Sequence, residues 1–356
     1  MFKRSLFGLV AAVALLTISA QVSQAQSFLM NLPRPSQRAE LVQRIGITDV
    51  AISYHRPLVN GRKIWGGIVP YGQVWRAGAN ENTTISFTDA VTIEGKPLDK
   101  GVYGLHMIPG ENEFTIIFSK MAVAWGSFTY DQKEDALRVI VKPQQTDMHE
   151  ALTYDFDDLK PDSSVVTLRW DKTAVPFKVG VNVEQVVEES LHNQFRGLVQ
   201  YTWSGWDDAA TYLVDNKGNM DDALKYVNRS IQSEDRFDNE MTKARVLDAM
   251  GKGDEAAAIR AKALASGTII HVHNYARGLM IAGKRQEGLD VFQVNIKKDP
   301  NNWIVHSEIA RIAVSKGDFD TAVKEMKLSV AGAPDPAKPQ IQGLLKRVEA
   351  KEDINK

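Results

Sequence analysis

The stretch VVTLRWDKTAVPFKVGVNVEQVVEESLHNQFRGL, residues 165–198, contains the point at which the chain changes from strand-like to helix-like patterning. Before Gly180, β-branched and aromatic residues come in short runs, as they do in β-strands. After Gly180, apolar residues are spaced by three and four positions, which is the spacing of an amphipathic helix. The stretch therefore predicts a boundary between a β domain and a helical domain at residues 180 and 181.

The strand-like pattern extends backward from Gly180 to about residue 50. Turn formers such as EGKP at 94–97 and PGEN at 109–112 separate the apolar runs. The runs recur at a spacing of about 8–12 residues, which is typical of an antiparallel sandwich or barrel. We therefore predict that residues 26–180 form an all-β antiparallel sandwich domain.

The helix-like pattern extends forward over residues 181–356 and contains a repeat. Gly218, Gly251, Gly283 and Gly317 follow one another at intervals of 33, 32 and 34 residues, and a small residue lies five positions after each. Small residues let the two helices of a hairpin approach closely, and glycine permits the turn between them. Over about residues 206–336 this spacing resembles the tetratricopeptide repeat. The resemblance implies an all-α helical-repeat solenoid whose concave face binds a protein or peptide partner; the alternative is a plain helical bundle.

Residues 1–25 have the three-part plan of a secretory signal peptide. Lys3 and Arg4 precede the apolar run Leu6–Ala20, and a polar stretch with small residues ends at Ala25. The run of about 15 apolar residues is shorter than the roughly 20 that span a bilayer. We expect cleavage near Ala25, a periplasmic or secreted protein, and no stable membrane span afterwards; the alternative is a retained anchor.

Composition excludes several functional classes. The formal net charge is −1, so no global attraction draws the chain to nucleic acid or to an anionic membrane, and no nucleic-acid partner is expected. The chain has no cysteine, which excludes thiol catalysis and zinc–thiolate sites. Phosphate-binding loops and nucleophile elbows are missing from the sequence. His271 and His273 would diverge on a helix, so neither a metal nor a cofactor is expected.

The segment YHRPLVNGRKIWGGIVPYGQVWRAGANENTT, residues 54–84, is rich in basic, aromatic and glycine residues. Arginine offers a planar fork that suits carboxylate or phosphate, and a tryptophan ring can stack on a sugar or another ring. We name these residues the basic-aromatic segment and predict that it binds a small anionic or carbohydrate-like ligand. The candidate ligand-binding residues are Tyr54, Arg56, Arg62, Trp75, Arg76, Asn80, Glu81, Thr83 and, from a later strand, His106.

Two other interpretations fit the same residues. A hydrolase-type enzyme could use His106 or Glu81 as its base, while Arg56 and Arg76 stabilise an anion. Alternatively, the segment is purely structural: its arginines pair with the acidic residues at 155–158, Trp75 packs in the core, and only the repeats have a function. Single arginine-to-alanine changes would then unfold the domain rather than weaken a ligand.

The order of unusual residues in the segment resembles a known family. The patterns Tyr54-x-Arg56-Pro57, Gly61-Arg62, Pro70-Tyr71-Gly72 and Trp75-Arg76-x-Gly78-Ala79-Asn80 are similar to those of the bacterial family called domain of unknown function 2911. The similarity extends over about residues 28–180. It implies a small exported β domain, often followed by helical repeats, and it implies no particular activity.

Overall fold

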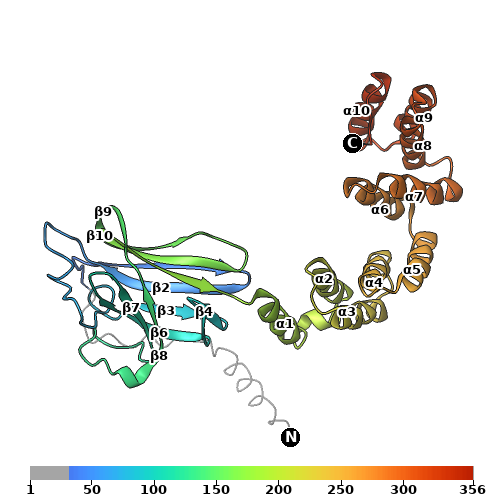
Figure 1. The fold of residues 1–356 in the computed structure, drawn as a ribbon. Helices are drawn as coiled ribbons and strands as arrows, with labels where there is room; N and C mark the ends of the chain where they lie inside the picture. The colour runs from blue at the N-terminus through green and yellow to red at the C-terminus, as the bar shows by residue number, and fades with distance from the viewer. Residues whose placement is uncertain (1–31, 356) are drawn as a thin grey trace, which may run out of the picture. The chain divides into compact units, whose positions relative to one another are not determined.

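The computed structural model describes residues 32–355, which form two compact units that divide between Val186 and Val187 (Figure 1). The first unit contains the antiparallel sheets and the second contains helices. This confirms the predicted fold class, an antiparallel β domain followed by a helical solenoid. The predicted signal peptide, residues 1–25, lies outside the described residues, so its cleavage and the export of the protein remain predictions.

Two antiparallel sheets make up the β domain. One has six strands in the order β1-β2-β3-β6-β7-β8, and the other has four in the order β5-β4-β10-β9. The strands are β1 (Gln37–Ile45), β2 (Thr48–Arg56), β3 (Thr84–Phe87), β4 (Val91–Ile93), β5 (Lys96–Leu98), β6 (Gly101–Pro109), β7 (Phe114–Ser119), β8 (Asp135–Val141), β9 (Gln144–Asp157) and β10 (Ser163–Gly180).

Alternating burial explains why the strands pack as they do. In β2, Thr48, Val50, Ile52 and Tyr54 are buried, and the residues between them are more exposed. This period of two directs one face of the strand into the core. Most of the buried apolar residues of both sheets belong to a single hydrophobic cluster. Each large apolar side chain contributes about 1.5–3 kcal/mol when it is fully buried, so this cluster is the main source of stability.

The helical unit is built from hairpins. The helices are α1 (Val183–Gln194), α2 (Trp203–Asp215), α3 (Met220–Ser233), α4 (Phe237–Ala249), α5 (Gly253–Ser266), α6 (Ile269–Ile281), α7 (Arg285–Lys298), α8 (Trp303–Ser315), α9 (Phe319–Gly332) and α10 (Lys338–Glu349). The pairs α2–α3, α4–α5, α6–α7 and α8–α9 pack together, and α10 packs on α9. No helix within residues 32–355 is both long enough and apolar enough to cross a membrane.

The repeated glycines lie at the hairpin turns. Gly251, Gly283 and Gly317 have left-handed φ angles of 76°, 83° and 76°, which glycine adopts at little cost. The first hairpin differs, because its left-handed residue is Lys217, at φ 55°, rather than Gly218. The turns therefore account for the period of the glycines, and the likeness to tetratricopeptide repeats rests on this hairpin geometry.

The hydrophobic core of the helical unit is divided. One cluster joins α2 and α3 with the C-terminal end of α4, a second lies between α6 and α7, and a third joins α8, α9 and α10. Because these clusters are separate, the helices are stabilised locally rather than by one central core.

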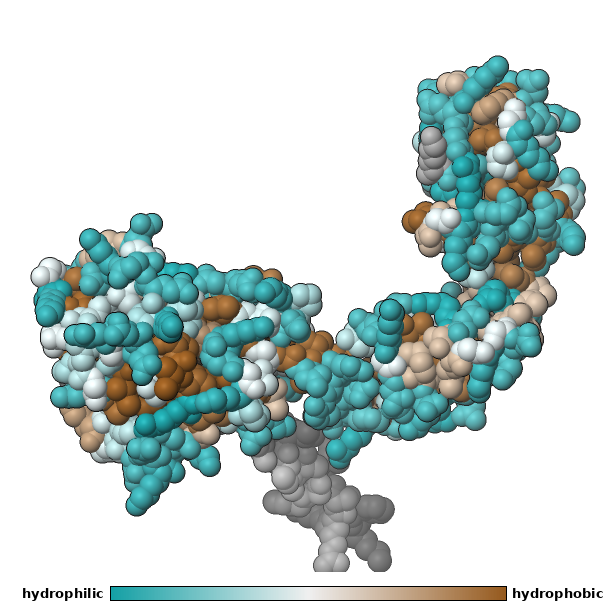
Figure 2. Space-filling model, viewed as in Figure 1, coloured by the Kyte–Doolittle hydropathy of each residue, from teal (hydrophilic) through white to brown (hydrophobic). Residues whose placement is uncertain are grey.

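On the face shown in Figure 2, hydrophilic side chains cover most of the surface, and hydrophobic patches interrupt them on both units.

Candidate functional site

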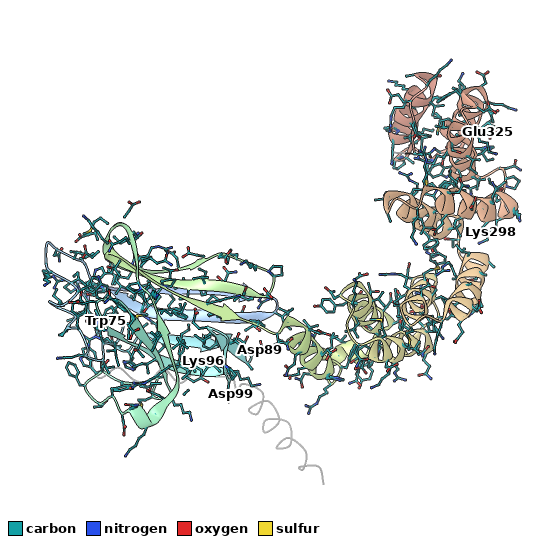
Figure 3. The ribbon with its side chains drawn as sticks, viewed as in Figure 1. Trp75, Asp89, Lys96, Asp99, Lys298 and Glu325 are labelled. Carbon is teal, nitrogen blue, oxygen red and sulfur yellow. The ribbon has the colours of Figure 1, made fainter. Side chains whose placement is uncertain are left out.

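Part of the basic-aromatic segment is core. Trp65 packs edge-on against Trp75 at 5.7 Å, and Trp75 stacks on Trp170 at 5.9 Å between ring centroids. The indole nitrogen of Trp75 donates to the carbonyl of Gly78 at 3.1 Å. Figure 3 labels Trp75 among the side chains of the β domain. The ring is therefore held by other rings, as the structural interpretation expects, and we remove it from the candidate site.

Three further predicted residues also have internal partners. Tyr54 is 4% exposed, and its hydroxyl accepts from the backbone nitrogen of Tyr154 at 3.2 Å. Thr83 is fully buried and donates to a backbone carbonyl at 3.2 Å. Asn80 adopts a left-handed φ of 58° and donates to the carbonyl of Ser36 at 3.3 Å. These side chains stabilise the loop and the strands rather than face a ligand.

Two of the arginines fasten the segment to the domain. Arg56 donates through Nε to the carbonyl of Leu152 at 3.0 Å and through Nη2 to the hydroxyl of Thr153 at 2.8 Å, which links β2 to β9. Arg62 donates through Nε to the carbonyl of Val59 at 3.0 Å, within its own loop. Both guanidinium groups are therefore occupied by the protein itself.

The acidic residues at 155–158 do not pair with this segment, contrary to the structural interpretation. Asp155 and Asp157 bind Arg169 at 3.2 and 2.6 Å, and Asp158 binds Lys160 at 2.8 Å. Because β9 and β10 are adjacent strands, Arg169 reaches these carboxylates from its own sheet. The arginines of the segment are satisfied by carbonyl and hydroxyl oxygens instead.

Glu81 lies at the centre of a charged group. Arg34 donates two hydrogen bonds to its carboxylate, at 2.7 and 2.9 Å, and Nε2 of His55 lies 3.4 Å from Oε2. Burial acts to raise the pKa of Glu81. The hydrogen bonds from Arg34, a backbone hydrogen bond and the charges of His55 and Arg34 together outweigh burial, so the pKa of Glu81 is lowered. Burial, together with nearby arginines, lowers the pKa of His55. Glu81 is therefore an ionised, paired carboxylate.

Arg76 differs from the other arginines of the segment. Its guanidinium is half-buried, and within residues 32–355 its Nε has no hydrogen-bond partner. Burial lowers the pKa of Arg76, and the charge of Glu81 offsets part of this effect. The guanidinium carbon lies 6.0 Å from the ring centroid of Phe128, and a Cβ atom added to Gly126 would lie 2.1 Å from Nη1. The loop at 120–131 therefore passes closely over the guanidinium group of Arg76.

His106 lies beside Arg76. Trp75 and Met107 exchange two backbone hydrogen bonds at 2.8 Å, so the adjacent residues Arg76 and His106 are opposite each other in the antiparallel register. His106 is 2% exposed, and its Nδ1 lies 2.8 Å from the hydroxyl of Ser127. Burial lowers the pKa of His106 to about 4, although Asp135 opposes the shift. The imidazole is therefore neutral at pH 7.

Gly104 lets the loop at 120–131 close on β6. A Cβ atom at this position would lie 2.5 Å from the carbonyl oxygen of Met121 and 2.9 Å from Nδ2 of Asn82. We name the group formed by Arg34, His55, Arg76, Glu81 and His106, with this loop over it, the Arg76 site. Sequence reasoning included three of the five residues. It missed Arg34 and His55, because Arg34 lies 47 positions from its partner Glu81 and no local pattern links them.

We predict that Gly104→Ala lowers the free energy of unfolding of the β domain by about 2 kcal/mol, because the methyl group overlaps backbone and must displace the loop. Urea denaturation measures the loss. Gly278→Ala on α6 is a control for the substitution itself: its added Cβ would meet nothing within 4 Å, and alanine favours a helix over glycine, so this change should not destabilise the helical unit. A Gly104→Ala protein as stable as the wild type would show that the loop moves away without cost.

The hydrolase interpretation gains little from this geometry. Glu81 is engaged by Arg34, and His106 is enclosed and bound to Ser127. In residues 32–355, no three His, Asp or Glu side chains come together as a metal site would need. His271 stacks on Phe237 at 5.2 Å, while Nδ1 of His273 pairs with Glu308 at 2.9 Å, so the two histidines diverge on α6.

A pocket of about 300 Å³ lies on the helical unit. It is formed by α2, α4 and α6, which are the first helices of three consecutive hairpins. Its walls combine aromatic, acidic and amide side chains, a mixture that no single sequence motif reveals. The lining residues are Asp207, Phe237, Asp238, Met241, Thr242, Arg245, His271, Asn274 and Tyr275. We name it the α2–α4–α6 pocket.

Comparison with known proteins identifies the β domain alone. A search of the curated proteins gave no match. Residues 36–179, which extend from just before β1 to the end of β10, match one family model. That model is described as Protein of unknown function (DUF2911), so the β domain of this chain is similar to that family, as its sequence patterns predicted.

Proposed function

We propose that the β domain binds a small anionic ligand at Arg76. The observation that carries the proposal is the half-buried guanidinium whose Nε has no hydrogen-bond partner within residues 32–355. A buried donor left unpaired costs about 1–3 kcal/mol, and more when it is charged. A carboxylate or phosphate oxygen would supply the missing acceptor and a matching charge.

The neighbouring charges favour an anion. Arg34 and Glu81 form a close pair and largely neutralise each other, so Arg76 contributes an excess positive charge to the site. His106 adds no charge at neutral pH. A carbohydrate is less well supported, because Trp65 and Trp75, the rings that would stack on a sugar, are packed against other rings. Binding is better supported than hydrolysis, since His106 is enclosed.

A thermal-shift screen of phosphates, carboxylates and sugars tests this proposal. An anion at 100 times its dissociation constant should stabilise the protein by about 2.7 kcal/mol, which is a shift of a few degrees. We expect Arg76→Gln to remain folded and to lose this shift. Arg44→Gln is the control, because Arg44 is an exposed arginine of the same domain that pairs with Asp49 and not with a residue of the Arg76 site. Equal stabilisation of the Arg76→Gln protein would contradict the proposed site.

We also propose that the helical unit binds a protein or peptide partner, since the α2–α4–α6 pocket lies on the first helices of successive hairpins. Export to the periplasm or the medium belongs to the same proposal and rests on the plan of residues 1–25. The mass of the protein recovered from outside the cytoplasm tests export, because an intact Met1 terminus would contradict it.

A further inference from the structure

We propose that the α2–α4–α6 pocket holds the cationic side chain of a lysine or arginine in a peptide partner. This inference rests on the partner-binding role proposed above and specifies the chemistry of the partner. It goes beyond that role because it names the residue type that is recognised and the groups that recognise it.

An incompletely paired carboxylate provides the first argument. Oδ1 of Asp207 is buried and has no hydrogen-bond partner within residues 32–355. Burial raises the pKa of Asp207, a hydrogen bond from Thr242 opposes the shift, and the charges of Asp208 and Asp238 add to it. The carboxylate therefore lies in surroundings that leave its negative charge poorly compensated. An ammonium or guanidinium group would provide both the missing donor and the missing charge.

The charges around the pocket are complementary to a cation. Asp207 and Asp238 both line it, and Arg245 is the one arginine or lysine among the lining side chains, which also include His271. Arg245, however, forms an ion pair with Asp215, which does not line the pocket. Arg245 is therefore shared between Asp215 and the pocket, and its charge is the smallest of the effects on Asp207. With two carboxylates and one shared arginine, the pocket retains an excess of negative charge.

The aromatic wall provides the second argument. Phe237 stacks on His271 with 5.2 Å between centroids and 19° between planes, and Tyr275 meets Phe237 edge-on at 6.4 Å. A lysine or arginine head group is attracted to the face of an aromatic ring, because the face carries the negative part of the ring's quadrupole. Aromatic rings beside carboxylates therefore favour a cationic side chain over an apolar or an acidic one.

The size and position of the pocket favour a peptide. A volume of about 300 Å³ is at the small end of ligand pockets, which suits one side chain. Asn274 is exposed on the rim, and no side-chain hydrogen bond of it is found within residues 32–355. An amide group offers both a donor and an acceptor, so Asn274 could bind the main chain on either side of the inserted residue.

A displayed library of short random peptides tests the inference, with the full-length protein as the target that selects the binders. We expect the selected peptides to share a lysine or arginine. A selected peptide, labelled with fluorescein and titrated by fluorescence anisotropy, should bind Asp207→Asn at least tenfold more weakly. Asp254→Asn, which removes an exposed carboxylate from α5, should bind as the wild type does.

The possible outcomes separate this inference from the role on which it rests. Selected peptides without a common cation, or a cationic peptide that binds the Asp207→Asn protein unchanged, would overturn the lysine or arginine site and leave partner binding in place. A selection that enriches no peptide would overturn both. Because Asp207→Asn removes a poorly compensated charge, the variant is expected to fold, and circular dichroism checks that it does.

Discussion

Replacing Arg56 with alanine should lower the free energy of unfolding of the β domain by about 3 kcal/mol, because the change removes the two charge-assisted hydrogen bonds that link β2 to β9. Arg76→Ala should change it by less than about 1 kcal/mol, since within residues 32–355 Arg76 gains from its contact with Phe128 and from the charge of Glu81, while its buried Nε is without a partner. Both arginines belong to the basic-aromatic segment, but we expect Arg56 to stabilise the fold and Arg76 to contribute little to stability.

Urea denaturation can be monitored by hydrogen exchange in peptides from β2 and β9. This readout separates the unfolding of the β domain from that of the helices. Loss of protection in these peptides reports the link that Arg56 makes between them. Arg38→Ala provides a baseline for removing an exposed arginine of the same domain. Equal losses for Arg56→Ala and Arg76→Ala would mean that Arg76 has structural partners equivalent to those of Arg56.

Acidification should destabilise the β domain by about 3 kcal/mol between pH 6.5 and pH 4 through His106 alone. The folded-state pKa of His106 is about 4, because the ring is buried, whereas the unfolded chain has the ordinary value of 6.5. Between these values the unfolded state binds more protons, so the free energy of unfolding falls as the pH falls. The contribution is present in full above pH 6.5 and is lost by pH 4.

His106→Asn should remove this contribution, so that stability varies less across the same pH range. Burial also lowers the pKa of His55, and therefore the difference between the wild type and the variant isolates His106. Chemical denaturation at a series of pH values measures that difference. Parallel profiles for the two proteins would show that His106 is protonated in the folded domain at a much higher pH than its burial implies.

The fold class could be predicted because it depends on local patterns. The change of period at Gly180 coincides with the last residue of β10, and α1 begins at Val183. The glycine repeat marked the hairpin turns, because a left-handed turn favours glycine wherever it occurs. The first hairpin shows the limit of this signal, because Lys217, the residue before the repeated Gly218, takes the left-handed conformation there.

The candidate site could be predicted only in part, because sheet register decides which side chains meet. Arg56 and Arg76 look alike in the sequence, but only Arg56 lies within reach of the carbonyl oxygens of β9. The pairing of Arg34 with Glu81 and of His106 with Ser127 joins segments that are distant in the chain. A basic-aromatic composition therefore indicated a candidate region without distinguishing structural residues from accessible ones.

The divided core of the helical unit affects how the protein should be described thermodynamically. Because separate hydrophobic clusters stabilise the α2–α3, α6–α7 and α8–α9 hairpins, each hairpin depends mainly on its immediate neighbours. Unfolding of such an array is a sum of local equilibria, and its cooperativity weakens where neighbouring clusters share little surface. One melting temperature cannot then summarise the helices. A terminal hairpin can open while the others remain folded, and each opening has its own equilibrium constant.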